Sequence, residues 1–348
     1  MRDPIKGPRM ITASVHPDQQ HTPTWQQELA TAITRPEELA EILDLPPESL
    51  AAAASAAGHF PLRVPRSFLA RIRRGDPRDP LLLQILPVGE ELADHPGYGA
   101  DPVGERAALR APALLQKYQG RALLIATATC AVHCRYCFRR EFPYTDQSGG
   151  PRWSEALAEI ARDPSLEEVI LSGGDPLSLS NARLASLARA LSAIPHIRRI
   201  RVHTRQPVVL PSRIDAPLLH WLRSASLPVV FVLHINHPRE IDGAVMQACS
   251  ALRSTGVTLL NQSVLLAGVN DEADVLVELS QRLFQAGVLP YYLHALDPVR
   301  GAAHFAVPDE RARSLAGALA ARLPGYLVPR LVREVSGAPA KVVLPPRL

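Results

Sequence analysis

ALLIATATCAVHCRYCFRR, residues 122–140, joins a short apolar run to three of the four cysteines of the chain. The run 122–129 has the length and composition of a buried β-strand. Cys130, Cys134 and Cys137 follow it at once, with the spacing C-x3-C-x2-C. This stretch therefore predicts a strand that ends in a loop of metal-ligating thiols.

The pairing of a strand with a helix recurs along the rest of the chain. Five more strand-like runs lie at 168–172, 197–204, 228–236, 257–266 and 289–296. Runs with helical apolar periodicity follow the strands, at 154–163, 180–194, 215–225, 242–256, 273–287 and 309–323. Six consecutive strand-then-helix units predict a parallel sheet with right-handed crossovers.

Polar residues collect where each predicted strand ends. They are the cysteines, SGGD (172–175), HTR (203–205), HINH (234–237), NQS (261–263) and Asp297. Packing of a core strand gives no reason for this pattern, whereas barrel-type α/β enzymes build their sites at the carboxyl ends of their strands. We therefore expect an α/β fold with a partial (β/α)6 barrel, and an open doubly wound sheet is the alternative.

The first part of the chain has a different character. Residues 1–105 read as a helical and irregular N-terminal extension, and prolines and glycines at 96–113 suggest a linker. Residues 106–348 form the predicted core domain.

Composition excludes several classes of protein. The net charge of +4 is spread along the chain, which argues against direct nucleic-acid binding. No apolar run reaches the length of a membrane span, and the polar start has no signal-peptide core, so we expect a cytoplasmic protein. Four cysteines do not make a disulfide framework in that setting, and Cys249 reads as a packed helix residue.

Three clustered thiolates suit an iron–sulfur centre. They can hold three irons of a [4Fe–4S] cluster and leave the fourth iron open to another ligand. Zinc is the alternative, but it would require a fourth ligand such as His133 or a distant residue. The position of the loop directly after the first barrel strand favours iron–sulfur.

These motifs resemble the radical S-adenosylmethionine (SAM) family. The resemblance implies that SAM chelates the open iron and that Tyr136 lies against its adenine. It also implies that Ser172, Gly173, Gly174 and Asp175 meet the SAM amino group, since glycines permit close backbone approach.

A finer resemblance covers residues 60–345, which look like the lysine 2,3-aminomutase family. It rests on KYQGRALLI, CAVHCRYCFRR, SGGDPL, HINHPRE, LLNQSVLLAGVND, LDPVRGAAHF and GYLVPRLVREVSGAPAK. RVPRSFLARI and PYYLHALD are more similar to the bacterial branch that makes (R)-β-lysine for the modification of elongation factor P.

The resemblance implies pyridoxal phosphate (PLP) as a second cofactor, with Lys341 in SGAPAK as its Schiff-base lysine. A surface lysine in a tail is the plainer interpretation. However, arginine supplies nearly every positive charge here, and only Lys6, Lys117 and Lys341 are lysines. Since a guanidinium cannot form an imine, the scarce lysine in the matching loop favours the functional interpretation.

Recognition residues are implied one by one by the same resemblance. Arg139 corresponds to the residue that binds the substrate carboxylate, and Asp297 and Glu334 to the acids that hold the lysine ε-ammonium. Glu334 departs from the family, which has an aspartate there. The remaining correspondences are Tyr118 and Arg121 near the PLP phosphate, with Lys117 in place of an arginine, and His234 and Gln262 near SAM. His203 and Arg205 lie at the end of a predicted strand, on the same face. Only this position suggests a role in the site, and a role in the core is an equal alternative.

The implied activity is conversion of L-α-lysine to (R)-β-lysine by an isomerase that uses a [4Fe–4S] cluster, SAM and PLP. The implied partners are free L-lysine, an electron donor such as flavodoxin or ferredoxin, and the elongation factor P ligase. Two alternatives stay open, an aminomutase for arginine or glutamate and a non-catalytic metal-binding module that docks on the translation machinery.

Overall fold

The computed structural model describes residues 24–144 and 150–347. Its centre is one ten-stranded sheet whose strands follow the order of the chain. Strands β3 to β9 run parallel, whereas β1, β2 and β10 are antiparallel additions at the two edges. The strands are β1 (Leu109–Ala111), β2 (Leu114–Tyr118), β3 (Arg121–Thr127), β4 (Glu168–Gly173), β5 (Arg199–Thr204), β6 (Val229–His234), β7 (Thr258–Val264), β8 (Leu289–His294), β9 (Arg330–Arg333) and β10 (Val342–Val343).

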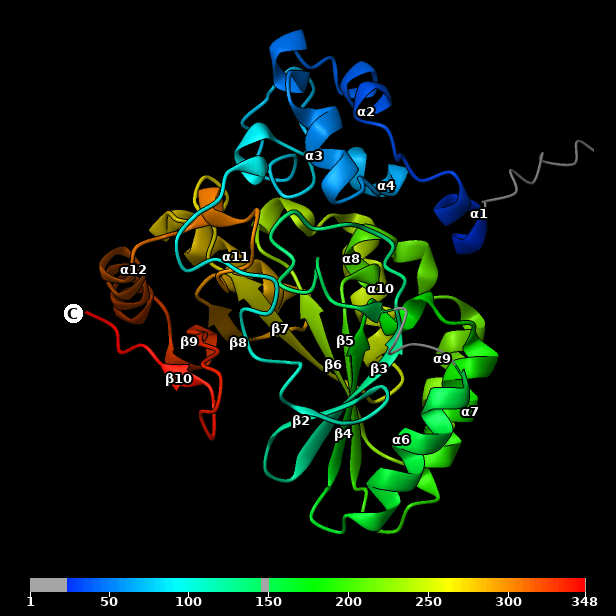
Figure 1. Cartoon of the computed structure of the whole chain (residues 1–348). Helices are drawn as coiled ribbons and strands as arrows, with labels where there is room; N and C mark the ends of the chain where they lie inside the picture. The colour runs from blue at the N-terminus through cyan, green and yellow to red at the C-terminus, as the bar shows by residue number, and fades with distance from the viewer. Residues whose placement is uncertain (1–23, 145–149, 348) are drawn as a thin grey trace, which may run out of the picture.

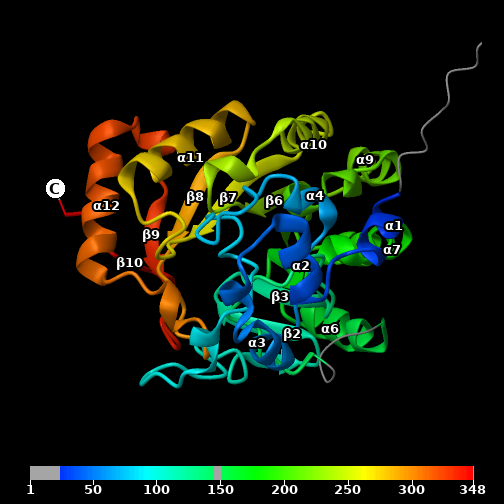
Figure 2. The same ribbon diagram turned by 90° about the horizontal axis from the view of Figure 1, so that it is seen from above.

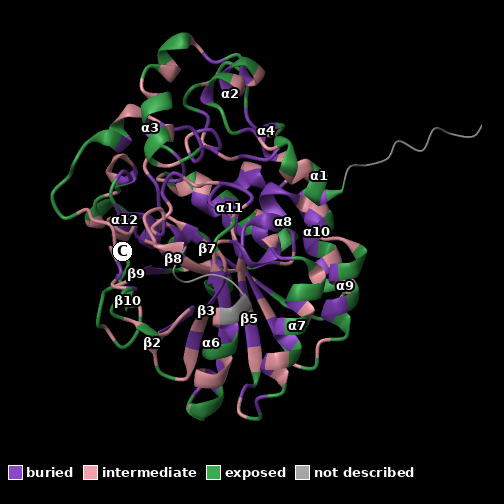
Figure 3. Ribbon diagram, turned by 45° about the vertical axis from the view of Figure 1, so that its right-hand side comes forward, coloured by how far each residue is buried: buried purple, intermediate pink, exposed green. Residues whose placement is uncertain are grey.

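The helices that connect the parallel strands lie outside the curved sheet (Figures 1 and 2). They are α6 (Gly150–Arg162), α7 (Asn181–Ser192), α8 (Gln206–Val209), α9 (Ala216–Arg223), α10 (Gly243–Arg253), α11 (Ala273–Gln285) and α12 (Asp309–Arg322). Ser180, Asp215 and Asp242 cap α7, α9 and α10, because each side chain accepts a hydrogen bond from a backbone N–H of the first turn. The central strand β4 and the short helix α8 are largely buried, whereas the edge strands β1 and β10 are mostly exposed (Figure 3).

The partial barrel predicted from the sequence is confirmed, and so are its six strand-then-helix units. The structure adds β9, a seventh parallel strand beside β8, and the edge strands. Register brings the carboxyl ends of neighbouring strands together, since Thr127 pairs with Gly173 and His234 with Gln262. The polar residues that end the strands therefore converge at one end of the sheet.

The N-terminal region covers that end of the sheet (Figures 1 and 2). It contains α1 (Trp25–Ala30), α2 (Pro36–Leu43), α3 (Ala53–His59) and α4 (Arg66–Leu69). Its apolar core continues into the cysteine loop through Ala131 and Val132. Two arginines of that loop, Arg135 and Arg140, also pair with Glu91 at 2.6 and 2.7 Å. The cysteine loop is thus packed between the sheet and the N-terminal region.

The segment 96–113 is not the free linker that its prolines and glycines suggest. Gly99 forms an isolated bridge with Val299, and residues 109–111 form β1. An ideal Cβ on Gly104 would lie 2.2 Å from the hydroxyl oxygen of Ser336, so this turn lies against the C-terminal part of the chain. The domain boundary at about residue 105 stays a prediction, and residues 1–23 of the extension lie outside the described residues.

Short 3-10 turns complete the fold at Pro47–Leu50, Gly89–Leu92, Pro176–Ser178, Pro211–Arg213, Pro238–Glu240, Ala303–Phe305 and Gly325–Leu327. Among the described helices, none has the length and apolar character needed to cross a bilayer.

Candidate active site

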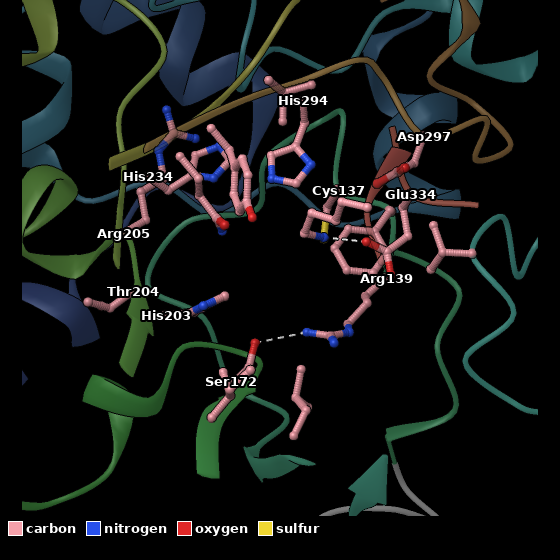
Figure 4. A pocket seen from close by; sticks show the side chains of 18 of the residues that line it. Cys137, Arg139, Ser172, His203, Thr204, Arg205, His234, His294, Asp297 and Glu334 are labelled. Carbon is pink, nitrogen blue, oxygen red and sulfur yellow. Dashed lines mark hydrogen bonds and ion pairs between the residues drawn. The ribbon is translucent and has the colours of Figure 1, made fainter. Parts of the chain in front are cut away.

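A cavity of about 650 Å³ opens at the carboxyl ends of the parallel strands (Figure 4). Its wall includes fifteen of the sixteen site residues expected from the sequence. They are Tyr118, Arg121, Cys130, Cys134, Tyr136, Cys137, Arg139, Ser172, Gly174, Asp175, His234, Gln262, Asp297, Glu334 and Lys341. Gly173 is the exception, but its carbonyl accepts a hydrogen bond from Tyr144 at 2.7 Å.

The three cysteines face this cavity from the loop after β3. Desolvation, followed by the charge of neighbouring thiols, raises the pKa of Cys130 well above its usual value and that of Cys137 to about 11. The Cys134 sulfur accepts a hydrogen bond of 2.8 Å from the guanidinium of Arg205. In the described part of the chain, no three His, Cys, Asp or Glu side chains are close enough together to hold a metal ion. The three thiols nevertheless share one cavity, and their donor chemistry fits an iron–sulfur cluster.

An aromatic pair forms the wall beside the cysteine loop. The rings of Tyr136 and His234 are stacked with centroids 5.6 Å apart. The Tyr136 hydroxyl contacts His234 Nε2 at 2.9 Å and accepts a hydrogen bond of 2.7 Å from Asn236. Gln262 is adjacent, because β7 pairs with β6 at His234. These flat, fixed surfaces suit a planar heterocycle such as adenine.

The SGGD turn is fitted closely to the cysteine loop. A Cβ on Gly174 would lie 2.6 Å from the Thr129 carbonyl oxygen, so no larger residue fits. The Asp175 carboxylate is already bound within the protein, by the Thr204 hydroxyl at 2.7 Å and the Arg205 backbone N–H at 2.8 Å. Asp175 thus connects the carboxyl end of β4 to that of β5.

Lys341 lies beside Glu334 in the loop between β9 and β10. Glu334 also accepts hydrogen bonds from the Tyr118 hydroxyl at 2.7 Å and from Lys117 at 3.3 Å, and its second oxygen accepts from Lys341. Desolvation opposes ionisation of Glu334, but Lys341, Tyr118 and Lys117 outweigh it and lower its pKa to about 2. The carboxylate is therefore ionised and surrounded by donors.

Asp297 has a raised pKa, in contrast to Glu334. Desolvation and then the charge of Glu334 raise its pKa to about 7, and Lys341 offsets only part of this. Its Oδ1 is buried and has no hydrogen-bond partner among the described residues. An unsatisfied carboxyl next to an ionised one is suited to receive a cation.

Arg139 is held by an acid that the sequence did not indicate. Glu105 accepts hydrogen bonds from its Nε at 2.8 Å and its Nη2 at 2.6 Å, and Nη1 donates to the Ser172 hydroxyl at 3.0 Å. Glu105 also raises the pKa of Arg139, although desolvation acts against it. Nothing in the linear sequence connects Glu105 with Arg139.

Two histidines of the cavity are also notable. Desolvation lowers the pKa of His294 to about 3 and that of His203 well below its usual value, so both are neutral near pH 7. Neither Nε2 has a hydrogen-bond partner in the described chain. His294 was missed from the sequence, although it ends β8 as His234 ends β6.

Comparison with known proteins gives consistent matches. Residues 119–202 match the family described as "4Fe-4S single cluster domain". The chain is 49% identical over 322 residues to L-lysine 2,3-aminomutase of Escherichia coli (strain K12), covering 92% of this chain and 94% of the relative. It is 34% identical over 324 residues to the Clostridium subterminale L-lysine 2,3-aminomutase, covering 92% and 78%. Among solved structures, a radical SAM methyltransferase from Sphaerobacter thermophilus is 22% identical, covers 63% of this chain and 68% of its own, and has a TM-score of 0.46.

Proposed function

The chain belongs to the L-lysine 2,3-aminomutase family, and from this premise we propose that it converts L-α-lysine to (R)-β-lysine with a [4Fe–4S] cluster, SAM and PLP. The observation that carries the proposal is that one cavity brings the three clustered thiols together with Lys341, Asp297 and Glu334. The thiols follow β3, Asp297 follows β8, and Glu334 and Lys341 follow β9, so these groups come from opposite ends of the parallel part of the sheet. The enzyme is an isomerase.

The residues present fit each proposed cofactor. Cys130, Cys134 and Cys137 would hold the cluster, and the stacked Tyr136 and His234 offer a flat wall to SAM. Lys341 supplies a primary amine to PLP. Its Nζ lies 5.9 Å from the centre of the Tyr118 ring and 6.0 Å from that of Tyr292, so the amine has aromatic neighbours. Two arginines of the cavity wall, Arg121 and Arg330, could receive a phosphate, whereas Arg201 is paired with Glu168.

When bound, the reduced cluster and SAM supply the radical that takes a hydrogen atom from lysine, and PLP supplies the π-system for amino migration. The chain itself binds and orients the substrate. Asp297 and Glu334 attract the ε-ammonium, and Arg139 attracts the α-carboxylate. The N-terminal region covers this end of the sheet.

The acids also support lysine over glutamate. Asp297 and Glu334 would repel a carboxylate side chain, so an aminomutase for glutamate is disfavoured. Arginine carries a cation as lysine does, and competition between the two substrates would distinguish them. Use of (R)-β-lysine by the elongation factor P ligase, reduction by flavodoxin or ferredoxin, and a cytoplasmic location are further parts of the proposal. The chain is more similar to the Escherichia coli relative, at 49% identity, than to the Clostridium subterminale relative, at 34%.

The test is an anaerobic incubation of the reconstituted protein with SAM, PLP, a reductant and L-lysine, analysed by chiral chromatography. We expect (R)-β-lysine from the intact chain and none from Lys341→Ala or Lys341→Arg. The arginine variant keeps the charge next to Glu334 but cannot form an imine, so it separates the two roles of the residue. Deoxyadenosine without β-lysine from the intact chain would contradict the assigned substrate. Neither product from protein with a complete cluster would contradict the proposed reaction as a whole.

A further inference from the structure

A buried ion pair joins Glu105 and Arg139 in the wall of the cavity. Both N–H···O distances, 2.8 and 2.6 Å, belong to a bidentate pair, and the two residues are only 4% and 7% exposed. A pair so well shielded from water fixes both side chains, because separating them would leave a buried charge without a partner.

Glu105 is held firmly by its own segment. The Asp101 carboxylate accepts hydrogen bonds from the backbone N–H groups of Glu105 at 2.7 Å and Arg106 at 3.1 Å. The carbonyl of Val103 accepts a hydrogen bond of 2.9 Å from Lys117. Gly104 has a φ of +68° and lies against Ser336, where a side chain would collide. The backbone at Glu105 is therefore fixed independently of Arg139.

The geometry leaves one end of the Arg139 guanidinium for another anion. Glu105 occupies the side formed by Nε and Nη2, and Ser172 accepts from Nη1. Nη1 also makes a long contact of 3.5 Å with the Gly173 carbonyl oxygen. Each terminal nitrogen of an arginine carries two hydrogens. Within the described chain, Nη2 therefore keeps one N–H beyond its bond to Glu105, and the second N–H of Nη1 is held only by this long contact. A second carboxylate can therefore bind at the Nη1–Nη2 end when it replaces the long contact with the Gly173 carbonyl.

We propose that Glu105 is a positioning residue, which sets the direction in which Arg139 meets the substrate α-carboxylate. The proposal rests on the proposed function, in which Arg139 binds that carboxylate. Without Glu105, the guanidinium could turn its Nε–Nη2 side toward the substrate. The carboxylate and the carbon chain of lysine would then be displaced from the reacting groups, and displacement of this kind lowers the rate strongly.

The test compares L-lysine with L-lysinamide, which keeps the ε-ammonium and lacks the carboxylate charge. For the intact chain we expect a large preference for lysine in kcat/KM. In Glu105→Gln the ratio of kcat/KM for lysine to that for lysinamide should fall about tenfold or more. A coupling of this size is expected if Glu105 acts on the substrate carboxylate through Arg139. Asp79→Asn is the matched control, since Asp79 is also fully buried and pairs with an arginine, Arg239, outside the cavity wall. The preference of Asp79→Asn for lysine over lysinamide should equal that of the intact chain.

A purely structural role for Glu105 would lower kcat/KM for lysine and lysinamide equally, and an unchanged preference would overturn the inference. Cluster content and the thermal midpoint of each variant are measured together with the two values of kcat/KM. If the intact chain forms no β-lysine, the proposed function fails instead. The preference is then read from calorimetric binding of lysine and lysinamide, where a ratio that Glu105→Gln leaves unchanged again overturns the inference.

Discussion

Asp297→Asn should stabilise the protein above pH 7 while it weakens the handling of lysine. The pKa of Asp297 is raised from its usual value of 3.8 to about 7. A raised carboxyl pKa means that the folded protein binds the proton more tightly than the unfolded chain does. The contribution of Asp297 to the free energy of unfolding is therefore fully present below pH 3.8, and it is lost as the pH rises to about 7.

The size of the effect follows from the same difference. Three pH units correspond to about 4 kcal/mol between the protonated and ionised forms. This is an upper limit, because Asp297 is partly exposed to the cavity, where water screens its charge. The neutral amide removes the cost at every pH. Relative to the wild-type protein, Asp297→Asn should thus gain stability between pH 4 and pH 7 and keep a constant advantage of up to about 4 kcal/mol above that.

Urea unfolding of both proteins at several pH values, without cofactors, measures the difference. Asp94→Asn is the control, because the Asp94 side chain is 96% exposed and should give no difference at any pH. A stability difference for Asp297→Asn that does not change with pH would refute the reasoning. For the reconstituted enzyme, we expect kcat/KM for lysine to fall by about ten- to a hundredfold, the usual effect of losing a charged hydrogen-bond partner.

Two further predictions concern the cysteine loop. Gly174→Ala should lower the thermal midpoint, since its Cβ would lie 2.6 Å from a backbone oxygen and such overpacking costs about 1–3 kcal/mol. Gly243→Ala, where a Cβ would meet nothing within 4 Å, should leave the midpoint unchanged or raise it, and equal midpoints for both variants would contradict the explanation. Glu91→Gln should destabilise the protein by about 3–5 kcal/mol in urea unfolding, because it leaves Arg135 and Arg140 without their buried anion. A change below 1 kcal/mol would show that these arginines find other partners.

The sheet could be predicted from the sequence because its strands are long enough to show their own patterns. Residues 168–172 and 228–236 are apolar runs with a polar end, and both ends meet at the cavity as expected. β9 was missed, because RLVR is short and follows a run rich in proline and glycine. The segment 96–113 was read as a linker for the same reason, since composition says nothing about what the backbone packs against.

The site shows a similar division. The cysteines could be predicted from residue type and spacing, whereas the role proposed for Lys341 came from the resemblance of its loop to a known family. Contacts between distant parts of the chain could not be predicted from the sequence. Many acids could pair with Arg139, and only the fold brings Glu105 to it. The raised pKa of Asp297 and the lowered pKa of Glu334 likewise depend on desolvation and on neighbours brought together in space.

The loop between β9 and β10 begins with Glu334 and ends with Lys341. One short hairpin therefore carries both a residue proposed to select the substrate side chain and the residue proposed to anchor the cofactor. An insertion or deletion in this turn would disturb both at once, whereas a substitution at Glu334 could alter selectivity and leave the anchor in place. Transfer of this segment between relatives would exchange recognition and attachment together.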